Sequence, residues 1–211
     1  MTHKKYFLGL ASLMILAFTG CKKETTEKVS TTLKVPTIEL LGDEFISQAP
    51  GGSYTDLGAK YTGEDGSETT IQPSVNEVDP STPGIYFIEY EETSTSGIFH
   101  TVAHRVVAIA YQDDPTDYSG TYLRTATGIN AFVTRIAPGL YKVQNPGGSA
   151  GHEAVTVYFV ETALNTFEGP LQPNDLVGDI EVNSISFSDT GGSWALVNPL
   201  YGPAVRVFVK Q

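Results

Sequence analysis

Short runs of alternating apolar and polar residues fill the chain from about residue 36 to its end, and most are closed by Gly, Pro, Asn or Asp. Alternation with a period of two residues predicts β-strands that bury one face. In the run that follows Gly84, for example, Tyr86, Ile88 and Tyr90 share one face. The turn residues recur every ~8–12 residues, which is typical of β-sandwiches. The sequence therefore predicts an all-β protein.

A polar, acidic stretch divides the strand-rich part of the chain. Residues 111–118, YQDDPTDY, combine three acids with a proline, and we expect them to form an exposed, fairly stiff linker. We therefore predict one domain over 36–110 and a second over 119–211. An alternative is a calcium ion bridging Asp113, Asp114 and Asp117, although their spacing lacks the pattern of an EF-hand loop.

The second domain shows seven runs with strand character. They are residues 120–126, 131–136, 140–144, 154–161, 181–188, 193–197 and 204–210. Turn residues separate each run from the next. Short connections between successive strands favour an antiparallel β-meander, curled into a small barrel or sandwich.

The N-terminus differs from the rest of the chain. Lys4 and Lys5 precede 13 mostly apolar residues, Tyr6 to Phe18. A membrane-spanning helix needs ~20 such residues, so the run is too short to span and is typical of a secretory signal peptide over residues 1–20. Residues 22–35 contain almost no large apolar side chains, and we interpret 21–35 as a solvated tether.

The four residues Phe18 to Cys21 (FTGC) resemble the lipobox of bacterial lipoproteins, with Phe18 in place of the usual leucine. The resemblance implies cleavage before Cys21 and attachment of lipid to its sulfur. Cys21 is the only cysteine; the alternative is an ordinary signal peptide with an incidental cysteine. Lys22–Glu24 partly resemble the surface-export signal of Bacteroides-type bacteria. Together these resemblances imply an outer-membrane protein, held to the membrane by lipid and displayed on the cell surface.

Both predicted domains carry segments that resemble known families. Residues 36–42 (PTIELLG), 52–59 (GSYTDLGA), 82–86 (TPGIY) and 105–107 (RVV) resemble the bacterial immunoglobulin-like (Ig-like) domain of cell-surface proteins. This implies an Ig-like β-sandwich over 36–110, although 91–97 depart from the family pattern. Residues 120–122, 138–143 and Trp194 resemble a C-terminal domain of unknown function that accompanies this Ig-like domain in lipoproteins of gut bacteria.

The charge of the chain restricts its partners. Without residues 1–20 the chain carries 11 basic and 24 acidic residues, a net charge of −13. Such a surface repels the phosphates of nucleic acids, which we exclude as partners. A single cysteine also excludes an intrachain disulfide, so each domain depends on its own core.

Two motifs with catalytic or metal-binding spacing lack the context they need. Residues 147–151 (GGSAG) match G-x-S-x-G, but a nucleophile elbow requires a helix after the serine, and a predicted strand follows here. His100 and His104 lie ~13 Å apart on a predicted strand, too far for one zinc ion. We therefore predict no enzymatic activity, no metal and no cofactor.

Aromatic residues of the second domain are the candidate ligand contacts. They are Trp194, Tyr141, Tyr201 and Phe132. A flat ring can cover the apolar face of a sugar; the alternative is that Trp194 fills the domain core. By resemblance, we expect an accessory binding lipoprotein for glycans in polysaccharide uptake. The alternative is a structural module, or one that binds an outer-membrane protein, without a small ligand.

Overall fold

A computed structural model describes residues 34–211, which form fourteen β-strands and no helix. The all-β class predicted from the alternating pattern is therefore confirmed. The predicted signal peptide, Cys21 and nearly all of the predicted tether lie outside the described residues.

The N-terminal part of the described chain is a sandwich of two three-stranded sheets. Their bounds are β1 Thr37–Leu40, β2 Phe45–Gln48, β3 Ala59–Thr62, β4 Glu68–Ile71, β5 Gly84–Thr93 and β6 His100–Ile109. One sheet has the order β1-β3-β4 and the other β2-β6-β5, with β2 parallel to β6. Ile88 and Tyr90, predicted to share a face, lie fully buried between the sheets.

A buried ion pair joins a loop of the sandwich to β6. The guanidinium of Arg105 donates hydrogen bonds to the Asp56 carboxylate, to the Leu41 carbonyl (2.6 Å) and to the Asp43 carbonyl (3.0 Å). The Tyr90 hydroxyl donates to Asp56 at 2.5 Å. Arg105 is 1% exposed, so these acceptors are what make its burial tolerable.

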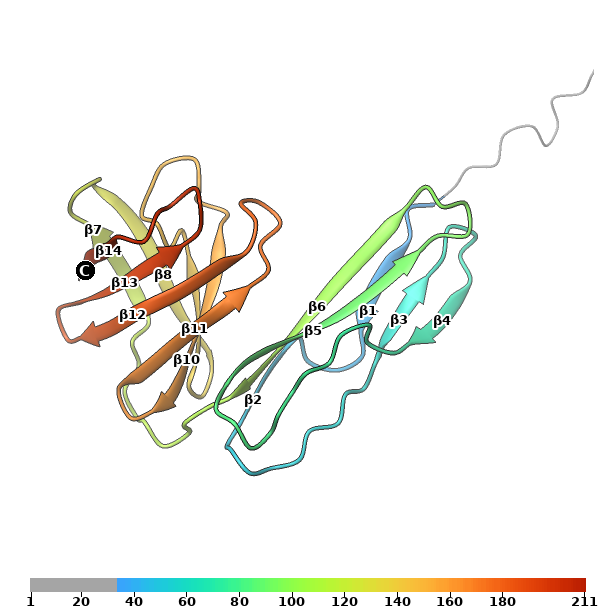
Figure 1. The fold of residues 1–211 in the computed structure, drawn as a ribbon, viewed down its shortest axis with the longest axis horizontal. Coiled ribbons are helices and arrows are strands. Elements are labelled where there is room, and N and C mark those ends of the chain that lie inside the picture. The colour runs from blue at the N-terminus through green and yellow to red at the C-terminus, as the bar shows by residue number, and fades with distance from the viewer. Residues whose placement is uncertain (1–33) are drawn as a thin grey trace, which may run out of the picture. The chain divides into compact units, whose positions relative to one another are not determined.

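The C-terminal part is a closed eight-stranded barrel (Figure 1). Its strands are β7 Gly120–Arg124, β8 Ile129–Ala137, β9 Leu140–Gln144, β10 Thr156–Ala163, β11 Thr166–Gln172, β12 Ile180–Ser188, β13 Gly191–Val197 and β14 Val205–Lys210. Each strand pairs antiparallel with its neighbours in sequence, and β14 pairs with β7 to close the ring. Of the two predicted forms of the meander, the barrel is the one observed.

Strand β11 was not predicted, because Gly169 and Pro170 within it resemble strand breakers. The register between β11 and β12 shifts between Gly169 and Gln172. The amide side chain of Gln172 continues the pairing with β10: its oxygen accepts from the Tyr158 N–H (2.6 Å) and its nitrogen donates to the Tyr158 carbonyl (3.1 Å). A β-bulge of this kind tolerates residues that an unbroken ladder excludes.

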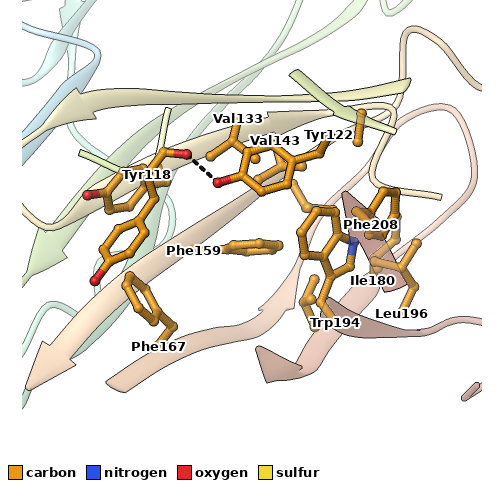
Figure 2. Close-up of a cluster of buried hydrophobic side chains, with 14 of the residues drawn as sticks. Tyr118, Tyr122, Val133, Val143, Phe159, Phe167, Ile180, Trp194, Leu196 and Phe208 are labelled. Carbon is orange, nitrogen blue, oxygen red and sulfur yellow. Dashed lines mark hydrogen bonds between the residues drawn. The ribbon is translucent and has the colours of Figure 1, made fainter. Parts of the chain in front are cut away.

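Aromatic side chains fill the inside of the barrel (Figure 2). Trp194 stacks on Phe208 with 4.1 Å between ring centroids and forms a T-shaped pair with Phe159, with 5.5 Å between centroids. The Tyr122 hydroxyl donates to the Tyr118 carbonyl at 2.7 Å. Small barrels are commonly filled in this way by the inward-facing half of each strand.

A third buried cluster contains side chains from both the sandwich and the barrel. Val106 and Ala108 of β6 pack with Leu140 and Val160 of the barrel. The Ser47 hydroxyl of β2 donates to the Pro138 carbonyl at 2.5 Å. The sandwich and the barrel therefore share a small apolar interface of their own.

The segment 111–118 is less exposed than its composition predicted. Asp114 is 3% exposed and Tyr118 is 7% exposed, although Asp113 and Asp117 remain exposed. The Tyr111 N–H donates to the Glu161 carbonyl of β10 at 2.7 Å. The linker is thus attached to the barrel by this backbone hydrogen bond.

Candidate functional site

Two of the four aromatic residues proposed as ligand contacts belong to the core instead. Trp194 and Tyr141 are both 0% exposed. The Trp194 indole N–H donates to the Pro146 carbonyl at 2.7 Å, which satisfies the only polar atom of the ring. Closure of the barrel explains this outcome, since Trp194 and Leu196 lie on the inward face of β13. The core alternative for Trp194 is therefore correct.

The other two residues lie in separate places. Phe132 is on the outer face of β8 and is 45% exposed. Tyr201, in the turn between β13 and β14, is half-buried against His152, with 5.4 Å between ring centroids, and lies beneath the guanidinium of Arg206. The four rings therefore do not form a common surface, and the prediction that they bind a sugar together is wrong.

The G-x-S-x-G segment forms a loop at one end of the barrel. The Ser149 hydroxyl lies 3.2 Å from His152 Nδ1, a contact between residues three apart in a turn. Strand β10 follows the loop, whereas a nucleophile elbow needs a helix. The neighbouring Glu153 carboxylate accepts from the Gly151 N–H, and within 34–211 it makes no hydrogen bond to His152. The pair has the geometry of a turn, and no carboxylate of the described residues is hydrogen-bonded to His152 as a third member would be.

His100 and His104 each face a carboxylate on the neighbouring strand β5. His104 Nε2 lies 3.1 Å from Glu89, and His100 Nε2 lies 3.5 Å from Glu91. In the described part of the chain, no group of three or more His, Cys, Asp or Glu residues could hold a metal ion. The alternative calcium site at Asp113, Asp114 and Asp117 therefore has no support in the geometry.

A cleft of about 400 Å³ lies where the sandwich meets the barrel. It is lined from the sandwich by Val75, Glu77, Ile85, Tyr86, Phe87, Glu89 and His104, and from the barrel by Leu171, Gln172, Pro173 and Asp179. A smaller hollow of about 290 Å³ continues it past Phe87 and His104 to Glu44 and Tyr158. Clefts of this size accept small ligands or a few units of a polymer.

The register of the β5–β6 hairpin builds one wall of this cleft. Ile85, Phe87 and Glu89 alternate along β5 on the face opposite to Ile88 and Tyr90. His104 pairs directly across from Glu89. One sheet face thus buries the sandwich core, and the other presents an aromatic ring and a carboxylate–histidine pair to the cleft.

Two loops complete the cleft. The loop before β5 is pinned to it by an isolated bridge between Val75 and Glu89, which brings Glu77 to the rim. On the barrel side, the fixed amide of Gln172 sets the end of β11 and so positions Leu171 and Pro173. Both hydrogen-bonding ends of Gln172 are occupied by backbone groups, so it supports the cleft without being free to bind a ligand.

Charge in the cleft is mainly negative. Glu77, Glu89 and Asp179 line the larger part and Glu44 the smaller, while His104 is the only basic side chain among the lining residues. Anionic ligands would be repelled. Carboxylates are strong acceptors for hydroxyl donors, and Phe87 and Tyr86 add apolar ring surface beside them. Sequence patterns could not indicate this site, because its residues are ordinary outward positions brought together by folding.

Comparison with known families identifies the N-terminal domain. Residues 38–109 match the family model described as bacterial surface protein, Ig-like domain. The predicted Ig-like domain is therefore confirmed, and it is of a type that occurs in bacterial surface proteins. A comparison with curated proteins finds no significant match.

One solved structure is similar along most of the chain. It is the crystal structure of a lipoprotein from Bacteroides thetaiotaomicron, which is 24% identical, and the match covers 83% of this chain and 100% of that one, with a TM-score of 0.37. A TM-score of this size does not show a shared fold, so no structural conclusion rests on it. Residues 34–211 contain no helix able to cross a membrane.

Proposed function

We propose that this protein is a lipid-anchored surface lipoprotein that binds neutral glycan chains in the cleft between its Ig-like domain and its barrel. The observation that carries the proposal is the cleft itself, whose lining combines the aromatic residue Phe87 with the acidic residues Glu77, Glu89 and Asp179. No catalytic group is required, and the role is binding alone.

The anchor follows from residues outside the described structure. Acylation at Cys21 would hold the chain at the outer membrane, and the polar segment 22–35 would space the Ig-like domain from the lipid. A bacterial surface Ig-like domain over 38–109 supports display on the cell surface. In this arrangement the binding cleft faces polymers outside the cell.

Sugar hydroxyls suit the chemistry of the cleft. A carboxylate accepts two hydroxyl hydrogen bonds, and each charge-assisted bond contributes about 1.5–3 kcal/mol. Aromatic rings cover the apolar faces of sugar rings. Acidic glycans are disfavoured, because several carboxylates already line the cleft. The expected ligands are thus uncharged polysaccharides or their fragments.

The test is a panel of neutral and sulfated oligosaccharides titrated against the chain produced without residues 1–21. We expect Glu89→Gln combined with Glu77→Gln to weaken neutral-glycan binding about 10-fold or more, because two charge-assisted acceptors are lost. Glu181→Gln, an exposed carboxylate on the barrel strand β12, is the matched control and should bind as the wild type does. Binding that is equal in the cleft variant, or absent throughout the panel, would remove the glycan proposal.

A second candidate, a module that binds another outer-membrane protein, is favoured by a different surface. Val205, Val207 and Val209 form an outward row on β14 and are 53%, 63% and 45% exposed. Exposed apolar rows of this kind mark protein contacts. Cross-linking on intact cells should distinguish the two: a partner lost in Val207→Lys but retained in the cleft variant would favour this role.

A further inference from the structure

The linker covers one end of the barrel through backbone and side-chain contacts. The Tyr141 hydroxyl, inside the barrel, donates to the Thr116 carbonyl at 3.2 Å. The guanidinium of Arg135 donates to the carbonyls of Asp114 (3.2 Å) and Thr116 (3.4 Å). The linker is therefore fastened to side chains of β8 and β9 in addition to its bond with β10.

Two carboxyl groups meet beneath this cover. Glu161 continues the inward face of β10 after Val157 and Phe159 and is 0% exposed. Asp114 enters from the linker and is 3% exposed, and its Oδ2 lies 3.4 Å from the Tyr118 hydroxyl. The same hydroxyl donates to the Asn165 side chain at 2.6 Å, and the Asn165 N–H donates to Glu161, so the two acids have the same immediate neighbours. A barrel strand and the linker thus each contribute one acid to the same buried place.

The remaining contacts of the two acids are unequal. Asp114 Oδ1 accepts from the Thr116 N–H at 2.8 Å, and its Oδ2 lies 3.4 Å from the Tyr118 hydroxyl. Glu161 Oε1 accepts from the Asn165 N–H at 2.9 Å, but Oε2 is buried and receives no hydrogen bond from any donor within residues 34–211. A buried, ionised oxygen without a partner is costly, and a proton placed on Glu161 removes that cost.

No cation in the described structure neutralises the pair directly. Arg135 is the basic group that faces it, and its hydrogen bonds go to backbone carbonyls. The other titratable groups around it are the phenols of Tyr118 and Tyr141. Burial, followed by the neighbouring Asp114, raises the pKa of Glu161 to about 7. Burial acts to raise the pKa of Asp114, but hydrogen bonding with Thr116, Glu161 and Tyr118 outweighs it and holds that pKa below its usual value.

We propose that Glu161 and Asp114 share one proton, and that this carboxyl–carboxylate hydrogen bond fastens the linker over the barrel end and is lost when the pair releases that proton. Glu161 then donates the bond that Asp114 accepts. When the proton leaves, two adjacent buried carboxylates repel each other, and the linker is the side that can move away. The position of the linker becomes sensitive to pH through a pair that plays no part in the cleft.

The direction in which the pKa of Glu161 is shifted determines how the stability of the closed linker changes with pH. The carboxyl of Glu161 holds its proton more tightly in the folded chain than in the unfolded chain. Its contribution to the closed linker is therefore complete below the unfolded value of about 4.5 and is lost as pH rises through about 7. The linker should be most protected in mildly acidic solution.

Hydrogen exchange on the full chain in detergent, corrected for the intrinsic pH dependence of exchange, tests the proposal. Between pH 5.5 and 8.5 we expect amide protection over 111–118 to fall about 10-fold in the wild type. Glu161→Gln keeps a donor facing Asp114 and cannot ionise, so its protection should change by less than about 3-fold. Amides of β13, which lies away from the pair, serve as the internal reference.

Two further measurements keep the proposal falsifiable if the variant folds poorly. The carboxyl carbon of Glu161, followed by NMR in the wild type, should titrate near neutrality; a midpoint near that of an ordinary glutamate would overturn the proposal. Equal pH dependence in wild type and Glu161→Gln would do the same. If calcium at pH 8.5 restores protection in the wild type but not in the variant, the pair holds a cation in place of the proton, and the proposal is wrong.

Discussion

Replacement of Trp194 by alanine is the sharpest test of the barrel core. The indole ring is fully buried, stacks on Phe208 at 4.1 Å between centroids, and forms T-shaped pairs with Phe159 and Tyr122. Removal of a buried Trp typically costs about 3–5 kcal/mol. The Pro146 carbonyl also loses its donor, and an unsatisfied buried acceptor costs about 1–3 kcal/mol.

The packing loss and the hydrogen-bond loss are not fully additive, because the cavity can admit water to the Pro146 carbonyl. We therefore expect Trp194→Ala to lower the free energy of unfolding by about 4–6 kcal/mol. For a chain of this size each kcal/mol shifts the melting temperature by about 2–4 °C. Thermal melting followed by circular dichroism should therefore show a decrease of at least about 8 °C. Trp194→Phe retains most of the packing and loses only the hydrogen bond, so its cost should be about 1–2 kcal/mol.

A shift below about 3 °C for Trp194→Ala would contradict the packed-barrel interpretation. It would mean that the ring contributes little to the core, and the indole would again be a candidate ligand contact. If Trp194→Phe is as destabilised as Trp194→Ala, the hydrogen bond to Pro146 rather than ring packing would be the dominant contribution.

Three further predictions concern other parts of the chain. Asp56→Ala should lower the free energy of unfolding by about 3–5 kcal/mol in urea titrations, because Arg105 is left buried without its carboxylate, and Asp56→Ala with Arg105→Met should recover part of the loss. Gly191→Ala should cost about 1–3 kcal/mol, since an added Cβ would clash with the Phe208 carbonyl of β14. Gly84→Ala should be nearly neutral, since the nearest atom to its added Cβ would be 3.8 Å away in the Tyr86 ring. Cys21→Ala should abolish labelling by a fatty-acid analogue in cells, and undiminished label would end the lipoprotein interpretation.

Much of the fold could be predicted from the local sequence pattern, because apolar and polar residues alternate along most of the strands. The predicted strand over 140–144 coincides with β9, and the predicted strand over 181–188 differs from β12 by a single residue. Strand β11 was not predicted because Gly169 and Pro170 interrupt its pattern; at this irregular end, the side chain of Gln172 takes over the pairing with β10. Closure of the barrel likewise depends on pairing between its first strand, β7, and its last strand, β14, which are far apart in the sequence.

The candidate site could not be predicted in the same way. Aromatic content pointed to Trp194 and Tyr141, but composition does not distinguish the inward face of a barrel strand from its outward face. On Ser193–Val197 both faces are apolar, so the decision between core and surface came only from closure of the sheet. The residues of the cleft, such as Phe87 and Glu89, have no unusual spacing at all. They became neighbours of Leu171 and Asp179 because the sandwich and the barrel pack against each other.

The linker shows how far a composition argument can mislead about a single residue. Three acids beside a proline predict a solvated segment, and Asp113 and Asp117 are exposed as expected. Asp114, between them, is buried because its carboxyl accepts from the Thr116 N–H and lies near Glu161 at the barrel end that the linker covers. That burial requires a partner some 47 residues away in sequence, and the partner's inward direction is set by the alternation of β10. A charge pattern can therefore predict that the linker is polar. Only the folded barrel determines that Asp114, rather than Asp113 or Asp117, is the acid that shares a proton with Glu161.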